Sequence, residues 1–277
     1  MNKCTFEASV IVSFYNNVDA LICILRSLET QGDNFEVIVA DDGSKQENVD
    51  KAFEYIKSSP IPISHVWQKD SGFRKNRILN KALKLSQSEY IIFIDGDCIP
   101  QDNFVRDHIS NKEKGEILNG RRADIASSFK EKLLSSKHPN SFFKDNFVQI
   151  AKAYIQGRGK NVEKGIRVTN PMIFKILNNK KKGIVGCNFS VHKADLLDVN
   201  GFDNRYEIPC IGEDTDIEYR LLQKGKVLKN LFHQAIILHP QHPELPRLPQ
   251  ALELFEETKR QGNIVALDGY QQANNVD

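Results

Sequence analysis

The sequence predicts an α/β fold in which helices flank a mostly parallel, doubly wound sheet. Its first third alternates short β-branched apolar runs with helix-like patterns, an order typical of parallel sheets. The run Tyr90–Ile94 is apolar throughout, as expected of a strand buried on both faces. With 277 residues and a mass of 31.5 kDa, the chain is also long enough to bury a large core.

The elements of the first half follow a regular order. Strands are expected at residues 9–14, 36–40, 61–67 and 90–94. Between them, apolar residues recur at helical spacing and predict helices at 18–28, 44–56 and 78–85. Ser44 and Glu47 are expected to form a capping box at the start of the second of these helices.

The second half is less regular. Residues 102–182 are polar and predict mostly helical or irregular structure with few strands. Further strands are expected at 184–191, 227–231 and 235–238, and further helices at 194–199, 215–222 and 251–258. We therefore expect a single domain over residues 1–277 that contains a partly helical insertion.

Composition excludes several classes of protein. The chain has 38 Lys and Arg against 36 Asp and Glu, so its net charge of +2 gives no reason to expect a nucleic-acid partner. Its five cysteines are scattered, which argues against a disulfide framework or a structural zinc site. Because no apolar run resembles a membrane span or a signal peptide, we expect a cytoplasmic protein, peripheral at most at the inner face of the cell membrane.

Two carboxylates follow the fourth expected strand. Asp95 and Asp97 flank Gly96, so on extended backbone both side chains would point the same way. Ligands of doubly wound sheets lie beyond the carboxyl ends of the strands, and two oxygen donors there suit Mg²⁺ or Mn²⁺ carrying a phosphate. An Asp-Gly turn with solvated acids is the alternative interpretation.

Polar residues also follow the first two strands. Ser13, Tyr15 and Asp42 are expected on the same rim as Asp95, where they could hold a base or a ribose hydroxyl. The basic loop at 69–77 runs into a helix N-terminus, a place suited to anions such as a diphosphate. A turn with a helix cap, and a solvated basic helix start, are the simpler explanations.

A pair of acids precedes the helix expected at 215–222. Glu213 and Asp214 would lie beside a capping box formed by Thr215 and Glu218. The positive end of the helix would keep such a carboxylate ionised, so that it could accept a proton from a sugar hydroxyl. Acids are also common at helix N-termini for structural reasons alone.

Six segments occur in the order found in family 2 glycosyltransferases of the GT-A fold, which this chain resembles. They are SVIVSFYN, VIVADDGS, SGFRKNRILNKAL, IIFIDGDCIP, GCNFSVHKADLLDVNGFD and GEDTDIEYRLLQKG. The resemblance covers residues 8–100 and 183–240, whereas no family motif falls in 104–182. The part from GFD to GED is also similar to the acceptor region of galactosyltransferase-type and chondroitin-polymerase-type enzymes.

The resemblance also implies a role for each part of the chain. Residues 1–100 would bind the nucleotide sugar, and 101–182 would form a variable, helical and basic segment. Residues 183–245 would carry the acceptor and catalytic groups, and 246–277 a C-terminal helix and tail. The implied reaction is an inverting, metal-dependent transfer of a hexose or N-acetylhexosamine from a UDP-sugar. The acceptor would be a glycan or lipid-linked saccharide in surface polysaccharide or lipopolysaccharide synthesis.

The resemblance also implies roles for single residues. The nucleotide sugar would be bound by Ser13, Tyr15, Asp42, Arg74, Asp95 and Asn188. Mn²⁺ or Mg²⁺ would be bound by Asp97, Asp95 and His239, with His233 and His242 as competitors for the histidine position. Asp214 would be the catalytic base, and Glu213 would position the acceptor.

The segment from Lys152 to Lys182 is strongly basic, with nine Lys or Arg against the single acid Glu163. We expect it to contact anionic lipid or a diphosphate-linked lipid acceptor, although a solvated loop would have the same composition.

Two other functions compete with sugar transfer. A haloacid-dehalogenase-like phosphatase would use Asp95 and Asp97, but three expected strands precede them; a catalytically idle nucleotide-sugar-binding protein would have no use for the Glu213–Asp214 pair.

Overall fold

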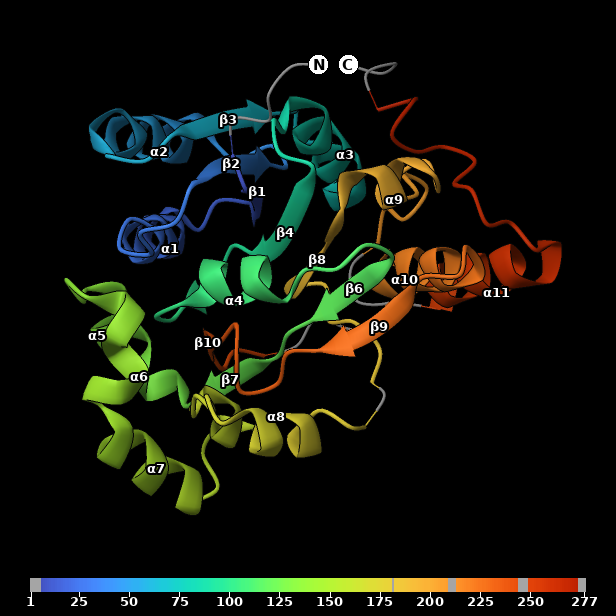
Figure 1. Cartoon of the computed structure of the whole chain (residues 1–277). Helices are drawn as coiled ribbons and strands as arrows, with labels where there is room; N and C mark the ends of the chain where they lie inside the picture. Colours follow the sequence, from blue (N-terminus) through green and yellow to red (C-terminus); the bar gives the residue numbers. More distant parts are fainter. Residues whose placement is uncertain (1–5, 181, 209–212, 244–248, 274–277) are drawn as a thin grey trace.

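The chain folds around a seven-stranded sheet, which confirms the α/β class predicted from the sequence (Figure 1). The computed structural model describes residues 6–180, 182–208, 213–243 and 249–273. The order of strands across the sheet is β3-β2-β1-β4-β8-β6-β9. These strands are β1 (Ala8–Phe14), β2 (Phe35–Asp41), β3 (Ile63–Trp67), β4 (Tyr90–Asp95), β6 (Glu116–Asn119), β8 (Asn188–His192) and β9 (Val227–Asn230).

The first four strands are parallel, at the positions that the sequence predicts. β1 pairs with β2 and β4, and β2 pairs with β3. β8 runs antiparallel to β4 and to β6, while β9 is parallel to β6. The second half of the chain therefore extends the parallel sheet beyond β4 with strands of mixed direction.

Helices cover both faces of this sheet. One face carries α1 (Val18–Leu28) and α2 (Gln46–Ser58); the other carries α3 (Lys75–Leu85), α9 (Lys193–Leu197) and α10 (Glu213–Gln223). Side chains of β1 alternate between the two layers, as the two-residue period of a strand requires. Val10 and Val12 pack into the core on the α1 side, and Ile11 packs on the α3 side.

A second sheet has the strand order β5-β10-β7. It is formed by β5 (Ile99–Pro100), β10 (Ile237–Pro240) and β7 (Arg122–Ile125). β10 is antiparallel to β5 and parallel to β7, and this register places His239 opposite Asp124. Both β6 and β7 lie in the segment expected to hold few strands. Each has only four residues, too short for a period to stand out, and each is held by partners distant in sequence.

The insertion is partly helical, as predicted. Its helices are α4 (Phe104–Asn111), α5 (Lys130–Leu134), α6 (Phe142–Asp145), α7 (Phe147–Ile155) and α8 (Pro171–Leu177), with 3₁₀ turns at 127–129, 139–141 and 162–165. The expected C-terminal helix is α11 (Pro249–Gln261). Among the described residues, no helix combines the length and the apolar character needed to cross a bilayer.

Neither predicted capping box forms. α2 begins at Gln46, and Ser44 Oγ instead accepts a hydrogen bond of 2.8 Å from the Asn16 amide. α10 begins at Glu213, so Thr215 lies inside the helix, and Glu218 Oε2 accepts a bond of 2.5 Å from the Ile184 amide. In both cases a partner from a distant segment replaces the local cap.

A buried ion pair anchors α10 to the rest of the domain. Arg220 Nη2 lies 2.6 Å from Asp216 Oδ2, and the arginine side chain is 1% exposed. Its Nη1 donates to the carbonyl oxygens of Val199 and Gly201 at 2.7 and 2.8 Å. This one side chain therefore ties α10 to the turn that follows α9.

We expect Arg220→Met to lower the free energy of unfolding by about 3–5 kcal/mol, because it leaves Asp216 as an uncompensated buried charge. Arg106→Met is the matched control. Arg106 is 58% exposed and lies 3.5 Å from Asp33, so its loss should cost less than about 1 kcal/mol. Urea denaturation measures both values, and similar costs for the two variants would contradict this account of the pair.

Candidate functional site

A cleft of about 470 Å³ lies beyond the carboxyl ends of β1, β2 and β4. Its lining includes Ser13, Tyr15, Asp42, Gly72, Phe73, Lys75, Asp95 and Asp97. Because parallel strands end at the same edge of a sheet, residues that are up to 84 positions apart meet here. The cleft therefore gathers most of the residues that the sequence places on the nucleotide-binding rim.

Asp42 accepts hydrogen bonds that hold together one wall of the cleft. Its Oδ1 accepts a hydrogen bond of 2.6 Å from Gln68 Nε2, and its Oδ2 accepts one of 2.8 Å from the Arg74 amide. Burial raises the pKa of Asp42, and these two hydrogen bonds oppose the shift. Next to it, Gly43 has a φ of +92°, and a Cβ there would lie 2.5 Å from the Asp70 Cα. The two loops of this wall therefore pack backbone against backbone.

Arg74 reaches Asp42 through its main chain and not through its guanidinium. The guanidinium donates to the carbonyl of Lys69, and Arg74 is not among the residues that line the cleft. Its neighbour Lys75 lines the cleft instead, with Nζ 2.8 Å from Asp95 Oδ1. Tyr15 is exposed at the rim, where its hydroxyl donates to Asp70 Oδ2 at 3.2 Å.

The two carboxylates around Gly96 have different surroundings. Asp95 ends β4, and its Oδ1 also accepts a hydrogen bond of 3.0 Å from Ser13 Oγ. Gly96 and Asp97 form a turn, and a Cβ on Gly96 would lie 2.4 Å from the Ser13 carbonyl oxygen. The expectation of extended backbone with both carboxylates pointing the same way is thus wrong, because the strand ends at Asp95.

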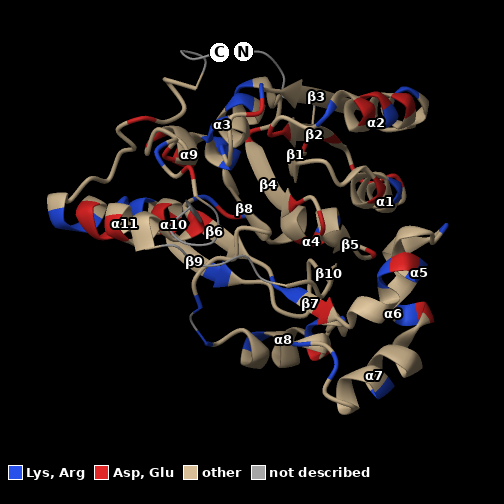
Figure 2. Ribbon diagram, turned by 180° about the vertical axis from the view of Figure 1, so that it is seen from behind, with Lys and Arg blue, Asp and Glu red and all other residues tan. Residues whose placement is uncertain are grey.

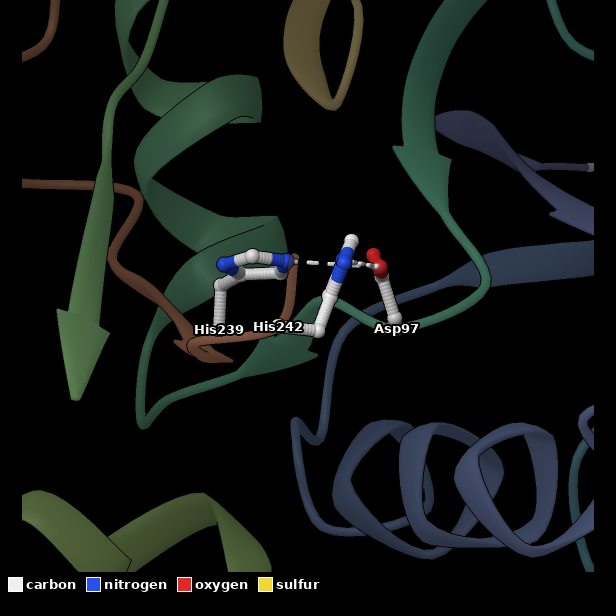
Figure 3. A group of neighbouring side chains, drawn as sticks. All are labelled: Asp97, His239 and His242. Atoms are coloured by element: carbon white, nitrogen blue, oxygen red, sulfur yellow. Dashed lines mark hydrogen bonds and ion pairs between the residues drawn. The ribbon is translucent and has the colours of Figure 1, made fainter. Parts of the chain in front are cut away.

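Asp97 instead joins two histidines, as Figure 3 shows. The Nε2 atoms of His239 and His242 lie 3.3 and 3.1 Å from Asp97 Oδ2. The ligand atoms of all three residues fall within 4.8 Å of one another. Asp97 precedes β5, His239 lies on β10 and His242 follows it, so the small second sheet brings the cluster together.

A carboxylate behind His239 fixes its ring. His239 Nδ1 lies 2.8 Å from Asp124 Oδ1 across the β10–β7 pairing, and Arg122 Nε lies 2.8 Å from the same oxygen. Burial lowers the pKa of His239, but Asp124 and Asp97 outweigh it and raise the value to about 9. Burial likewise opposes ionisation of Asp97, yet the His239 imidazolium holds the pKa of that carboxyl well below its usual range.

The cluster fits a divalent metal ion. His239 Nε2 is buried and, among the described residues, makes no hydrogen bond, even though it faces Asp97 at 3.3 Å. A ligating histidine usually gives its second nitrogen to a carboxylate, as His239 does to Asp124. Two imidazole nitrogens and one carboxylate oxygen form a recognised donor set for transition metals. Asp95 Oδ1 is engaged by Ser13 and Lys75, and its predicted role as a ligand stays a prediction.

Asp214 lies in the first turn of α10, outside the lining of the cleft. Its Oδ2 accepts a hydrogen bond of 3.1 Å from the Gly186 amide. The thiol of Cys187, the next residue, interacts with that of Cys98, which adjoins Asp97. Asp214 is therefore connected to the metal cluster through the segment that leads into β8. The side chain of Glu213 lies outside the described part of the chain.

Asn188 lies in the interior and outside the lining of the cleft, and its predicted contact with the nucleotide sugar stays a prediction. Its side chain is fully buried, and its Nδ2 donates to the carbonyl oxygens of Arg121 and Ala235 at 3.0 and 2.8 Å. Its Oδ1 lies 3.1 Å from His108 Nε2. Both ends of the amide are therefore engaged within the protein.

Two residues of the site, Gln68 and Asp124, escape the sequence-based assignment. Lys75 belongs to the basic loop expected to meet a diphosphate, although it is not named singly, and His242 is a competitor for the position of His239. The predicted competitor His233 is elsewhere, with Nδ1 3.0 Å from the Ile166 carbonyl oxygen. Asp124 carries no signal in the sequence, because its role arises from the pairing of β7 with β10.

Comparison with known proteins gives a consistent result. The model of the family described as Glycosyl transferase family 2 matches residues 9–192. Chondroitin synthase of Escherichia coli is 26% identical over 243 residues, which are 85% of this chain and 35% of that protein. Chondroitin synthase of Pasteurella multocida is 31% identical over 228 residues, 78% of this chain and 23% of that protein. The chain thus spans about a third or less of these two relatives.

Solved structures support the same fold. Residues 1–349 of TarS from S. aureus, in complex with UDP-GlcNAc, superpose with a TM-score of 0.58 at 18% identity, over 92% of this chain and 64% of that one. GalNAc-T7 with UDP, GalNAc and Mn²⁺ gives a TM-score of 0.60 at 15% identity, over 91% and 48%. At these identities the likeness shows the GT-A fold alone.

In the metal-free protein, His239 should make stability depend on pH. Its folded pKa of about 9 exceeds its ordinary 6.5, so its contribution is full below pH 6.5 and is lost as pH rises through about 9. In EDTA, the difference in melting temperature between wild type and His239→Gln should be larger at about pH 6 than at about pH 9.5.

His233→Gln is the control for that measurement. Burial lowers the pKa of His233, so its contribution to stability is lost as pH falls, and its difference from wild type should follow the opposite trend. A His239→Gln difference that stays constant over this pH range would show that folding does not raise the pKa of His239.

Proposed function

The chain belongs to glycosyl transferase family 2, and from this we propose an inverting, metal-dependent transfer of a hexose or N-acetylhexosamine from a UDP-sugar. The observation that carries the proposal is the cluster of Asp97, His239 and His242 at the edge of the cleft. Structures of the same fold with UDP-GlcNAc, and with UDP, GalNAc and Mn²⁺, support the nucleotide and the metal. The phosphatase has no such support, and the idle nucleotide-sugar-binding protein stays an untested alternative.

The described residues suit each part of the donor. Tyr15 offers an exposed ring at the rim of the cleft, and Asp42 holds the wall where we place the uridine. Ser13 and Asp95 lie deeper, where they would meet the ribose, and Arg74 supports this wall through its amide. Lys75 is the one Lys or Arg among the described residues that line the cleft, so we assign it to the diphosphate.

Asp97, His239 and His242 would hold the metal ion, with Asp95 at its predicted place beside them. Mn²⁺ suits the two imidazoles better than Mg²⁺, which prefers oxygen ligands only. Such an ion, when bound, neutralises the charge that develops on the leaving diphosphate. Asp124 orients His239 and keeps its Nε2 directed at the site.

We assign proton removal to Asp214. It lies in the first turn of α10, and the Gly186 amide fixes one of its oxygens. From there it would accept the proton of the acceptor hydroxyl as that oxygen attacks the anomeric carbon, with Glu213 beside it to position the acceptor. Attack on the side opposite the leaving UDP inverts the anomeric centre.

The acceptor that we propose is a glycan or lipid-linked saccharide in surface polysaccharide or lipopolysaccharide synthesis. The support is the similarity to two chondroitin synthases, of which the chain covers 35% and 23%. We also propose that residues 1–277 form one domain with the division described above, and that the protein acts in the cytoplasm. Contact of residues 152–182 with an anionic membrane is likewise a prediction.

Two substitutions separate the assigned roles. Asp97→Ala should lose the part of UDP affinity that depends on Mn²⁺, whereas Asp214→Asn should keep it, because only Asp97 belongs to the metal cluster. Both should lower turnover by about a hundredfold to a thousandfold. Calorimetric titration with UDP, with and without Mn²⁺, measures the affinities, and GDP serves as the nucleotide control. Equal UDP affinity in the two variants would reverse the assignment.

Asp124→Asn should weaken Mn²⁺ binding by about 10- to 100-fold, because His239 loses the carboxylate that orients its ring. Titration of the nucleotide-free protein with Mn²⁺, followed by electron paramagnetic resonance, measures this without reference to activity. Asp145→Asn is a matched control, since that carboxylate lies at the end of α6 and accepts a hydrogen bond from Ser141 in the 3₁₀ turn before this helix. Unchanged Mn²⁺ affinity in Asp124→Asn would remove Asp124 from the site.

A further inference from the structure

Helices α7 and α8 expose large apolar side chains to solvent. Val148 and Ile155 on α7 are 73% and 85% exposed, and Met172 and Ile176 on α8 are 76% and 73% exposed. α8 has no buried residue at all. Scattered apolar residues on a surface need no explanation, but four such side chains on two helices of one insertion do.

The orientation of α8 shows that this exposure is built into the fold. Phe174 packs against the core, and Asn178 Nδ2 donates to the Phe232 carbonyl oxygen at 3.1 Å, so this side of the helix faces the protein. At 100° per residue, Met172 and Ile176 lie on the opposite side. Both side chains therefore point away from the domain.

The same arrangement occurs on α7. Ile150 and Ala153 are buried, whereas Val148, Lys152 and Ile155 occupy the opposite side at helical spacing. In both views of the molecule, α7 and α8 lie at the same end, away from α3 and β3 (Figures 1 and 2). We call the set formed by Val148, Lys152, Ile155, Met172, Lys175 and Ile176 the docking surface.

The charge around the docking surface is mostly positive. Neither α7 nor α8 carries an acidic residue, and residues 147–180 contain only Glu163 (Figure 2). Lys152 and Lys175 belong to the surface itself, and Arg158 and Lys160 follow α7. Whatever covers this surface must accept apolar side chains and offer negative charge beside them.

We propose that the docking surface binds the surface of an anionic lipid bilayer. The four apolar side chains would insert between the lipid headgroups, while the lysines beside them would meet lipid phosphates. A bilayer supplies both chemistries over a broad area, as the outward direction of both helices requires. This proposal rests on the membrane contact predicted above for residues 152–182 and specifies the side chains that would make it, and it uses none of the residues assigned to the cleft or the metal cluster.

The test is flotation of the full chain with vesicles of phosphatidylcholine, with and without phosphatidylglycerol. Wild type should float only with the vesicles that contain phosphatidylglycerol. Met172→Ser/Ile176→Ser should lower the partition coefficient at least about tenfold. Lys152→Gln/Lys175→Gln should lower it roughly fivefold per lysine and flatten its dependence on salt.

Leu85→Ser/Leu197→Ser is the matched control, because it removes two exposed apolar side chains from α3 and α9, at the other end of the molecule. It should float like wild type. Circular dichroism and Mn²⁺-dependent UDP binding should be unchanged in all three variants, so a failure here is distinct from a failure of the proposed transferase function.

Three results would overturn the proposal. The first is that the wild-type protein floats with neither kind of vesicle, or floats equally with both compositions. Another is undiminished flotation of Met172→Ser/Ile176→Ser. The third is a wild-type dimer that Met172→Ser/Ile176→Ser converts to a monomer in analytical ultracentrifugation, because the docking surface would then be covered by a second copy of the chain.

Discussion

The pairing of β10 with β7 and β5 is the constraint on which the candidate site depends. It sets His239 opposite Asp124 and holds the turn that carries Asp97 beside them. The three residues are far apart in sequence, and two of them carry buried charge that is tolerated only with a partner at hand. A shift of one residue in this register would turn the His239 side chain to the other face of its sheet. His239 would then lose its contacts with Asp97 and Asp124.

The parts of the fold that could be predicted are those in which local sequence and tertiary structure agree. β1, β2 and β4 are largely apolar runs and β3 is a weaker one, with amphipathic helices between them, so both the strands and their parallel order follow from the pattern. The rim formed by Ser13, Asp42 and Asp95 follows in turn from the common edge at which parallel strands end. β6 and β7 could not be predicted, because four residues do not establish a period.

Errors about single side chains share one physical cause. Ser44 and Glu218 each have a local role in the sequence, and each is bound instead by a group from a distant segment. Arg74 and Lys75 show the same effect on a smaller scale, since one residue decides which side chain enters the cleft. The chemistry of the site was predictable, whereas the partner of each atom required the three-dimensional arrangement.

The insertion also connects the docking surface to the metal cluster. The amide of Lys160, shortly after α7, donates to the Asp124 carbonyl oxygen at 2.8 Å, and the Asp124 amide donates back at 3.0 Å. The Gly159 amide donates to Gln241 Oε1 at 3.1 Å, one residue before His242. Gln241 in turn donates from its amide to the Ile125 carbonyl oxygen at 2.9 Å. The loop that ends α7 is therefore part of the framework that fixes Asp124 and the two histidines. The insertion thus contributes to holding the metal cluster and also carries the surface that we assign to lipid.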